Sequence, residues 1–430
     1  MFEVFTTSLA FIVATLLLLG GIQIGVAIGI GGLLTLLLNE GPASLKAIGF
    51  IAWGSLNNST LSALPLFILM AEVMLRSGVS DSFYDGMARL IRRIPGGLLQ
   101  TNIMASAIFS AVSGSSVATA AAIGSVAIPR QKADGYDHAM LAGSVCAGGT
   151  LGNLIPPSIV MIIYATFSEL SVAKLFIAGV IPGIVLTLMF MAYIAMRCII
   201  DPKLAPPMPP AGKGSVWKGL KEVGPMLGLM VIILGSIYFG IATPTEAAAV
   251  GALLSVVIAL LVGRPPFKAY VDAFMNTVVI SAAILFIALG TFIFNYAVQT
   301  TGVTTALTKW VISLDLNVNV FLISLYVFYI LLGTVVEAIG MIVLTVPLLL
   351  PILTAYKVDL VWFGVILVVV VELALISPPV GMILFVVDHM MKEGAGPVLK
   401  GVTPYFYIFA IFLLLLLIVP ELATWLPTKM

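Results

Sequence analysis

A cluster of small polar residues interrupts the apolar stretch at residues 97–128. The interruption reads Ser113-Gly114-Ser115-Ser116, so three hydroxyl groups stand beside one glycine. This composition suits a tight turn that presents oxygen atoms and backbone N–H groups to a ligand. Small residues are also common where helices pack closely, and residues 118–122 fit that second interpretation better. We therefore predict a ligand-binding turn at the serines.

Two pairs of adjacent prolines, Pro156-Pro157 and Pro378-Pro379, each break an apolar segment. Proline lacks the backbone N–H that a helix needs, so each pair leaves carbonyl oxygens unpaired one turn earlier. Those carbonyls lie around residues 150–153 and 374–377. Such oxygens are ligands for a hard cation. The prolines therefore predict cation sites, with a structural cap on a kinked helix as the alternative role for the polar side chains beside them.

The helices that resume after the prolines, near Ser158 and Val380, add a second property. The first N–H groups of a helix have no partner within that helix, and they carry partial positive charge. An anionic group such as a carboxylate is stabilised there. The two breaks therefore predict that a cation and an anion bind close together.

Two carboxylates near apolar segments have local explanations. Glu72 precedes Arg76 by four residues, which puts both side chains on one helix face and predicts an ion pair. Glu246 follows Thr243-Pro244-Thr245 and fits the first turn of a capped helix. Neither residue therefore needs a ligand to explain it.

Glu337 and Glu372 are different, because carboxylates within apolar segments are costly and are often functional. Glu337 stands at the centre of the apolar stretch 318–355, in the interruption Glu337-Ala338-Ile339-Gly340. Glu372 precedes Ser377 by about one and a half helical turns. Each is expected either to bind a cation or to be protonated and neutral.

The composition sets the class of protein. The 430 residues are 61% hydrophobic and 9% charged, whereas a soluble domain carries about 25% charged residues. Many apolar blocks reach the length of about 20 residues that a bilayer requires. No cleaved secretory signal is expected at the start, where Glu3 precedes a long apolar block. Cys146 and Cys198 lie in apolar segments, and the net charge of +1 gives no sign of nucleic-acid binding.

We predict an all-α polytopic membrane protein. Full crossings are expected at 5–38, 50–75, 139–164, 172–197, 224–241, 246–262, 276–296, 360–388 and 402–420. The stretches 97–128 and 318–355 are interpreted as re-entrant helical hairpins, and 139–164 and 360–388 as broken helices. Basic residues gather at 76–93, 130–132 and 197–221, and they share one side only if 97–128 re-enters. This predicts a cytoplasmic N-terminus and a periplasmic C-terminus.

The second half of the chain repeats the first. Pro129 and Pro351 are 222 residues apart, and so are Pro156 and Pro378. The predicted repeats are residues 1–200 and 223–430, joined by a cytoplasmic linker at 201–222 that is rich in proline, glycine and lysine. Five crossings separate their starts, so the second repeat is inverted. Inverted repeats with broken helices are typical of secondary transporters.

Three motifs make the similarity specific. They are Ser-Gly-Ser-Ser-Val-Ala-Thr-Ala-Ala-Ala-Ile-Gly from Ser113, Gly-Gly-Thr-Leu-Gly-Asn-Leu-Ile-Pro-Pro-Ser from Gly148, and Thr-Pro-Thr-Glu-Ala-Ala-Ala-Val-Gly-Ala from Thr243. The chain resembles the large membrane subunit of a tripartite ATP-independent periplasmic (TRAP) transporter over essentially its whole length. It departs from that family at Asn153, usually aliphatic, and at Glu337, usually aspartate.

The resemblance implies sodium-driven uptake of an organic acid through an elevator-type motion, in the bacterial inner membrane. A periplasmic binding protein would deliver the acid, and a small four-helix membrane subunit would be a permanent partner. Sialic acid is favoured, with C4-dicarboxylates and 2-oxo acids as alternatives. Sodium is the expected coupling ion, and no organic cofactor is expected.

The predicted site residues follow from these points. We expect the acid near Ser113, Ser115, Ser116, Asn153, Pro156, Pro157 and Ser158, and sodium near Ser110, Gly114, Thr150, Gly152, Glu337, Gly340, Glu372, Ser377, Pro378 and Pro379. An enzyme is not expected. The Gly-Lys-x-Ser at Gly212 has Pro207 where a phosphate-binding loop begins with glycine, and no histidine is expected at membrane depth to activate a serine. A stand-alone sodium-coupled anion transporter and an ion channel remain alternatives.

Overall fold

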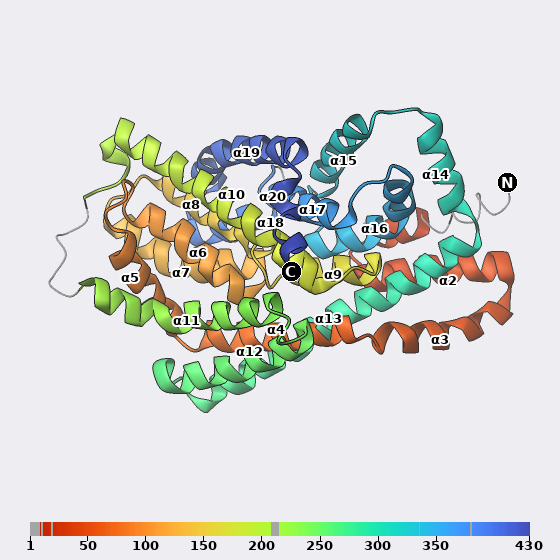
Figure 1. Cartoon of the computed structure of the whole chain (residues 1–430), viewed down its shortest axis with the longest axis horizontal. Coiled ribbons are helices and arrows are strands. Elements are labelled where there is room, and N and C mark those ends of the chain that lie inside the picture. The colour runs from red at the N-terminus through yellow and green to blue at the C-terminus, as the bar shows by residue number, and fades with distance from the viewer. Residues whose placement is uncertain (1–8, 10–11, 19, 208–214, 335, 379–380) are drawn as a thin grey trace.

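The computed structural model of the chain describes residues 9, 12–18, 20–207, 215–334, 336–378 and 381–430. Its helices in the first half are α2 Ile24–Glu40, α3 Leu45–Leu56, α4 Ser59–Arg76, α5 Val79–Ile91, α6 Leu98–Ser113, α7 Ser116–Ala133, α8 His138–Gly149, α9 Ile159–Ser168 and α10 Val172–Ile200. No strand occurs in these described ranges (Figure 1). The predicted all-α fold class is confirmed.

The second half continues with helices of the same kind. They are α11 Ser215–Tyr238, α12 Pro244–Ile258, α13 Phe267–Thr300, α14 Val303–Ser313, α15 Val318–Leu332, α16 Ala338–Ala355, α17 Leu360–Leu375, α18 Met382–Met391, α19 Ala395–Ile418 and α20 Glu421–Thr424. A helix satisfies its backbone hydrogen bonds internally, which is the requirement for crossing hydrocarbon.

Seven helices in the described part of the chain are long and apolar enough to span a membrane. They cover Ser59–Arg76, Val172–Ile200, Val216–Tyr238, Pro244–Gly263, Phe267–Thr300, Ala338–Ala355 and Ala395–Ile418. Nine crossings were predicted, and the difference has a physical cause. Six of the predicted crossings contain a helix of this kind, whereas those at 5–38, 139–164 and 360–388 are each divided between shorter helices. The seventh helix, Ala338–Ala355, lies in the stretch interpreted as a re-entrant hairpin.

The predicted crossing at 5–38 is wrong as a single helix. Residues 12–18 are helical, but the chain is not helical at residues 20–23, and α2 begins at Ile24. Gly21 has φ 81°, a left-handed conformation that ends a helix and that glycine adopts without a steric penalty. Residues 5–8, 10–11 and 19 lie outside the described residues.

The predicted crossing at 50–75 is also two helices. α3 ends at Leu56 and α4 begins at Ser59. Asn58 between them caps α4, because its side chain accepts the Thr60 N–H. A capping asparagine favours a helix start, so the break follows from a local signal in the sequence.

The predicted linker at 201–222 is too long. α11 begins at Ser215, so the last eight residues assigned to the linker are helical. Pro202–Leu204 form one 3₁₀ turn, and residues 208–214 lie outside the described residues. The charged residues of 215–222 favoured the linker interpretation, although this segment also carries apolar residues and is helical.

The two interrupted stretches do form pairs of helices. The first pair, α6 and α7, is separated at Gly114 and Ser115, where the sequence predicted the interruption. In the second, α15 ends at Leu332 and α16 begins at Ala338, so the interruption lies between these two residues rather than at residues 337–340. Glu337 occupies the N-cap position, which explains the shift of a few residues.

Several helices make very close contacts at glycine. Gly25 and Gly32 of α2 face α13, where an added Cβ would come within 2.9 Å of Ile287 Cα and 2.7 Å of Phe294 Cα. Small residues allow this approach between membrane helices. α13 also packs along α4, so α2, α4 and α13 form one group of helices (Figure 1).

The two local explanations for carboxylates are confirmed. Arg76 Nε lies 3.0 Å from Glu72 Oε2. Thr243 and Glu246 form a reciprocal capping box at the start of α12. A carboxylate in this place also offsets the partial positive charge of the helix N-terminus.

Charged residues outside the apolar core join the two halves. Lys132 Nζ lies 2.5 Å from Glu393 Oε1, and His138 Nδ1 lies 2.7 Å from Glu393 Oε2. Lys132 also donates to the carbonyl oxygen of Met391. The hydrogen bond from Lys132, followed by that from His138, lowers the pKa of the Glu393 carboxyl below its ordinary value of about 4.5.

Glu393→Gln tests this contact through its pH dependence. A carboxyl whose pKa is lower in the folded state stabilises the fold above the unfolded pKa, and this contribution is lost as the pH falls through the folded pKa. We expect the melting temperature of the wild type to exceed that of Glu393→Gln at neutral pH, and the difference to shrink as the pH falls below the ordinary pKa and through the lowered pKa of the folded state. Glu40→Gln, at the exposed end of α2, is the control for removal of a carboxylate elsewhere on the chain. A difference that persists below the pKa would refute the assignment.

Candidate functional site

The turn between α6 and α7 is built from the predicted serines. Gly114 ends α6 with φ 59°, in the left-handed region that glycine tolerates. Ser115 begins α7 as its N-cap, and its side chain accepts the Ala118 N–H. Ser113 Oγ lies 2.6 Å from Thr119 Oγ1. The hydroxyl groups thus hold the turn in shape, and the turn ends in the first N–H groups of α7.

The first broken helix has the predicted form. α8 ends at Gly149, Thr150–Gly152 form one 3₁₀ turn, and helix resumes with α9 at Ile159. The bond between Pro156 and Pro157 is cis. Ser158 is the N-cap of α9 and accepts the Met161 N–H at 3.2 Å. Ser158 therefore has the capping role that the sequence left as an alternative.

The turn and the break bind each other directly. The Asn153 N–H donates to Ser116 Oγ at 3.1 Å, and the Ile159 N–H donates to the Gly114 carbonyl at 3.3 Å. Gly152 lies against the same turn, and a Cβ there would come within 2.5 Å of Ser116 Cα. The two segments therefore form one structural unit.

Glu372 on α17 brings the second half of the chain into this unit. Its Oε1 atom accepts a hydrogen bond from Ser116 Oγ at 2.8 Å and another from Asn153 Nδ2 at 2.6 Å. The residue is 0% exposed, and Oε2 is buried without a hydrogen-bond partner among the described atoms. Of the two carboxylates whose role was open, this one lies in contact with the predicted binding residues.

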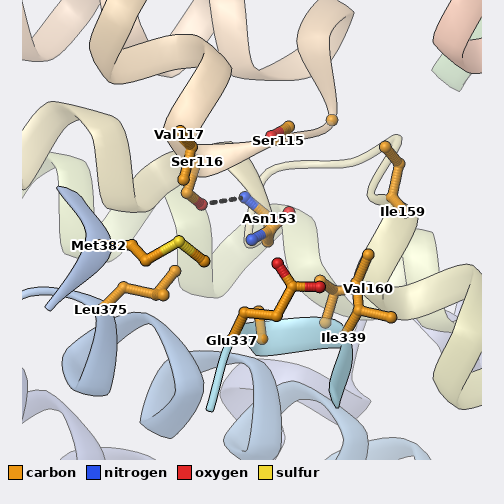
Figure 2. Close-up of a pocket in the computed structure, with 12 residues that line it drawn as sticks. Ser115, Ser116, Val117, Asn153, Ile159, Val160, Glu337, Ile339, Leu375 and Met382 are labelled. Atoms are coloured by element: carbon orange, nitrogen blue, oxygen red, sulfur yellow. Dashed lines mark hydrogen bonds between the residues drawn. The ribbon is translucent and has the colours of Figure 1, made fainter. Parts of the chain in front are cut away.

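An open pocket of about 80 Å³ lies beside this unit. It is lined by Gly114, Ser115, Ser116, Val117, Asn153, Ile159, Val160, Glu337, Ala338, Ile339, Leu375 and Met382. Figure 2 shows Glu337 pointing across the pocket toward Asn153. Glu337 makes no capping bond to α16, and it is the one ionisable side chain among the described residues of the lining.

Four helices begin at this pocket. The lining includes the first residues of α7 (Ser116 and Val117), α9 (Ile159 and Val160), α16 (Ala338 and Ile339) and α18 (Met382). Each helix start carries partial positive charge and N–H groups without intrahelical partners. Gly114 and Leu375, at the ends of α6 and α17, bring the opposite, carbonyl-rich ends to the same place. The pocket can therefore stabilise an anion and a cation side by side.

The predicted site residues divide into two groups. Those that line the pocket are Gly114, Ser115, Ser116, Asn153 and Glu337, and Glu372 lies directly behind them. The others do not line it. Ser113 lines a neighbouring pocket, Ser110, Thr150 and Ser377 donate to carbonyls of their own segments, and Gly340 lies inside α16. Pro156, Pro157 and Pro378 shape the breaks, and Pro379 lies outside the described residues.

The apolar walls of the pocket and part of its surroundings were not predicted from the sequence. Ile159, Val160 and Ile339 are wall residues that follow directly after the interruptions, and that position was the available signal. The neighbouring pocket contains Glu72 beside Ser113 and Ser115. Asn276 of α13 also contacts Glu72, with Nδ2 at 3.3 Å from Oε2. A contact between helices so far apart in the chain has no signal in the sequence.

Comparisons with known proteins agree with this architecture. The profile of the family "Tripartite ATP-independent periplasmic transporter, DctM component" matches residues 11–422. The chain is 35% identical to the C4-dicarboxylate TRAP transporter large permease protein DctM of Pseudomonas aeruginosa, over 93% of each chain. It is 33% identical to the protein of the same name from Vibrio cholerae, over 98% of this chain and 97% of that protein.

One further relative is named for a different substrate, and one solved structure shares the fold. The sialic acid TRAP transporter large permease protein SiaM of Vibrio cholerae is 31% identical over 87% of each chain. The crystal structure of the Alcanivorax borkumensis YdaH transporter superposes with a TM-score of 0.64 at 17% identity, covering 92% of this chain and 90% of that one. At this identity the similarity concerns the fold alone. From the family match and these relatives, the chain belongs to the DctM family of TRAP transporter large permeases and is a multi-pass membrane protein.

Proposed function

We propose that this permease imports an organic acid into the cell, driven by sodium, from a periplasmic binding protein that delivers the acid. The observation that carries the proposal is the meeting of four helix N-termini at one pocket. These termini can hold a carboxylate without any lysine or arginine. Relatives named for C4-dicarboxylates and for sialic acid both handle anions of this kind. We propose sialic acid, with C4-dicarboxylates and 2-oxo acids as competitors.

Sodium coupling is supported by the oxygen atoms around the pocket. The ends of α6 and α17 bring carbonyl oxygens to the lining, and Glu337 supplies a carboxylate whose side chain does not cap its helix. Hard cations prefer such oxygen ligands. Sodium that binds the ordered turn better than the disordered turn would favour acid binding, by no more than its differential affinity.

An inverted repeat is supported by the order of the helices. From α6 to α10 their lengths are 16, 18, 12, 10 and 29 residues, and from α15 to α19 they are 15, 18, 16, 10 and 24. Asp137 and Asp359 cap α8 and α17 and are 222 residues apart. Contacts also cross between the halves, since α9 packs on α16 and α18 packs on α7.

We further propose that α6–α10 and α15–α19 move together as a transport domain past a scaffold of α2–α4 and α11–α13. α5 contacts both groups. Its Arg89 pairs with Glu222 of α11, and its Asp85 pairs with Arg130 of α7. The small four-helix subunit would dock on the scaffold in the bacterial inner membrane, with the N-terminus of this chain cytoplasmic and the C-terminus periplasmic.

Uptake into proteoliposomes tests the proposal. The vesicles hold this chain with its small partner subunit, and radiolabelled sialic acid, succinate and pyruvate are offered with and without the binding protein and an inward sodium gradient. We expect uptake of one acid to require both. Uptake without the binding protein would indicate a stand-alone transporter, an acid-independent sodium current would indicate a channel, and no uptake of any acid would refute the proposal.

Ser115→Ala and Asn153→Ala then test the site in the same vesicles. Both side chains line the pocket, so each variant should lose uptake or change its sodium dependence. Ser158→Ala is a useful comparison, because Ser158 caps α9 and does not line the pocket. Unchanged uptake and sodium dependence in both pocket variants would refute this location.

A further inference from the structure

Glu372 stands behind the pocket rather than in it. It is fully buried and is not part of the pocket lining, whereas the two residues that it contacts, Ser116 and Asn153, both line the pocket. Ser116 and Asn153 come from the first half of the chain, and Glu372 comes 219 residues after Asn153. One residue of the second half therefore joins the hairpin turn and the broken helix of the first half.

We propose that Glu372 is a positioning residue, which holds Ser116 and Asn153 in place for the ligand and touches neither the acid nor the sodium ion. The inference rests on the proposed function for the identity of the site. It replaces the sequence-based expectation that Glu372 binds sodium directly.

The hydrogen bonds around Ser116 show how the positioning works. Ser116 Oγ accepts the backbone N–H of Asn153 at 3.1 Å and donates to Glu372 Oε1 at 2.8 Å. Asn153 donates its side-chain amide to the same oxygen at 2.6 Å. Three bonds thus close a ring of Ser116, Asn153 and Glu372. A ring of buried bonds leaves each side chain one orientation, because any rotation leaves a buried polar group unpaired.

The ring uses Glu372 as an acceptor only. Both donors converge on Oε1, while Oε2 is buried without a partner among the described atoms. A glutamine has the same length and offers a carbonyl oxygen as the acceptor, so it can keep both bonds. An aspartate is shorter by one methylene and cannot reach both donors from the same backbone position. The positioning role therefore predicts that glutamine at this position preserves transport better than aspartate does. A role that depends on the negative charge does not predict this order.

The transport test compares Glu372→Gln with Glu372→Asp and Glu372→Ala at saturating sodium, with the acid concentration varied. We expect Glu372→Gln to keep the KM of the wild type, and the other two variants to raise KM about tenfold each, since a buried donor is left unpaired. The sodium concentration for half-maximal uptake should stay unchanged in Glu372→Gln. A Glu372→Gln variant as inactive as Glu372→Ala, or one that needs much more sodium, would overturn the inference, because the carboxylate itself would then be the ligand.

A double-mutant cycle asks whether Glu372 acts through Asn153. Asn153→Ala, Glu372→Ala and the double variant are compared by the KM for the acid. If Glu372 works by holding Asn153, the KM of the double variant should not exceed the higher of the two KM values of the single variants. If the increase in KM of the double variant equals the product of the two single increases, the two residues act independently. That result would also overturn the inference.

A third measurement does not depend on transport. Hydrogen–deuterium exchange of the chain in nanodiscs reports how often the backbone amides at 113–119 and 150–154 open. We expect faster exchange in both segments for Glu372→Ala and wild-type exchange for Glu372→Gln. If Glu372→Ala exchanges at the wild-type rate in both segments, the positioning role is refuted. This conclusion holds even if vesicles with the wild-type chain transport none of the acids offered. A failure of the proposed function and a failure of this inference are therefore distinguishable.

Discussion

Gly152→Ala is expected to abolish acid uptake while the protein remains folded. A methyl group at Gly152 would lie 2.5 Å from both the N and the Cα atoms of Ser116 and 2.6 Å from the carbonyl carbon of Ser115. All three are backbone atoms, so no side chain can rotate away to relieve the contact. The turn itself must move, and Ser116 must then separate from Asn153 and Glu372.

The expected size follows from this displacement. Overpacking of this kind costs about 1–3 kcal/mol, which a large membrane protein can tolerate without unfolding. The displaced turn matters more, because a shift of about 1 Å in a binding group can reduce a rate about a hundredfold. Initial uptake rates in proteoliposomes measure the effect, and melting curves in detergent measure the fold.

Gly224→Ala is the matched control for Gly152→Ala. Gly224 lies inside α11, and no atom lies within 4 Å of an added Cβ. Alanine also favours helix over glycine, so this variant should keep its uptake and stability. Wild-type uptake by Gly152→Ala would show that the turn does not lie against Gly152 during transport.

Gly401→Ala is expected to have the opposite result, which is loss of folded protein. Gly401 of α19 crosses Gly143 of α8 with the two backbones in direct contact. A Cβ at Gly401 would come 1.9 Å from the Ala139 carbonyl oxygen and 2.9 Å from the Gly143 N atom. Relief requires that the two helices separate, which exposes the core around them and costs about 3 kcal/mol or more.

Gly396→Ala on the same helix is the control for this variant. Gly396 lies five residues before Gly401, and no atom lies within 4 Å of a Cβ built there. Fluorescence-detected size-exclusion chromatography after heating compares the two variants with the wild type. We expect Gly396→Ala to melt like the wild type and Gly401→Ala to give little monodisperse protein. Equal melting of the two variants would contradict the close crossing of α8 and α19.

The turn and the break that carry the predicted site lie where the sequence places them, because their signals are local. A serine–glycine turn, a double proline and a helix N-cap are each determined by neighbouring residues, and the interruption at residues 113–116 and the break before Ser158 lie where the sequence places them. Ser110, Thr150 and Ser377 were included by proximity along the chain, but their hydroxyl groups bond to carbonyls of their own segments. Distance along the chain does not show which way a side chain points on a helix.

The crossings at 5–38 and 50–75 were wrong as single helices for a related reason, although α4 within the second is long and apolar enough to span a membrane. Average hydrophobicity over a long window bridges the short polar interruptions at residues 20–23 and 57–58, and it reports burial in lipid rather than helix continuity. Gly21 and Asn58 carry the conformational signal at those breaks. Short-range signals of this kind are readable, but only when they are weighed separately from the apolar pattern.

The sequence by itself determined the membrane class, the all-helical fold, the family and the two interrupted segments, because composition, proline and glycine act locally. The tertiary structure alone decided that Glu372 meets Ser116 and Asn153, that Glu337 faces the pocket, and that four helices begin there. The contacts of Glu372 join residues more than 200 positions apart. They depend on how helices pack, and packing is set by the shapes of many side chains at once rather than by any residue and its neighbours.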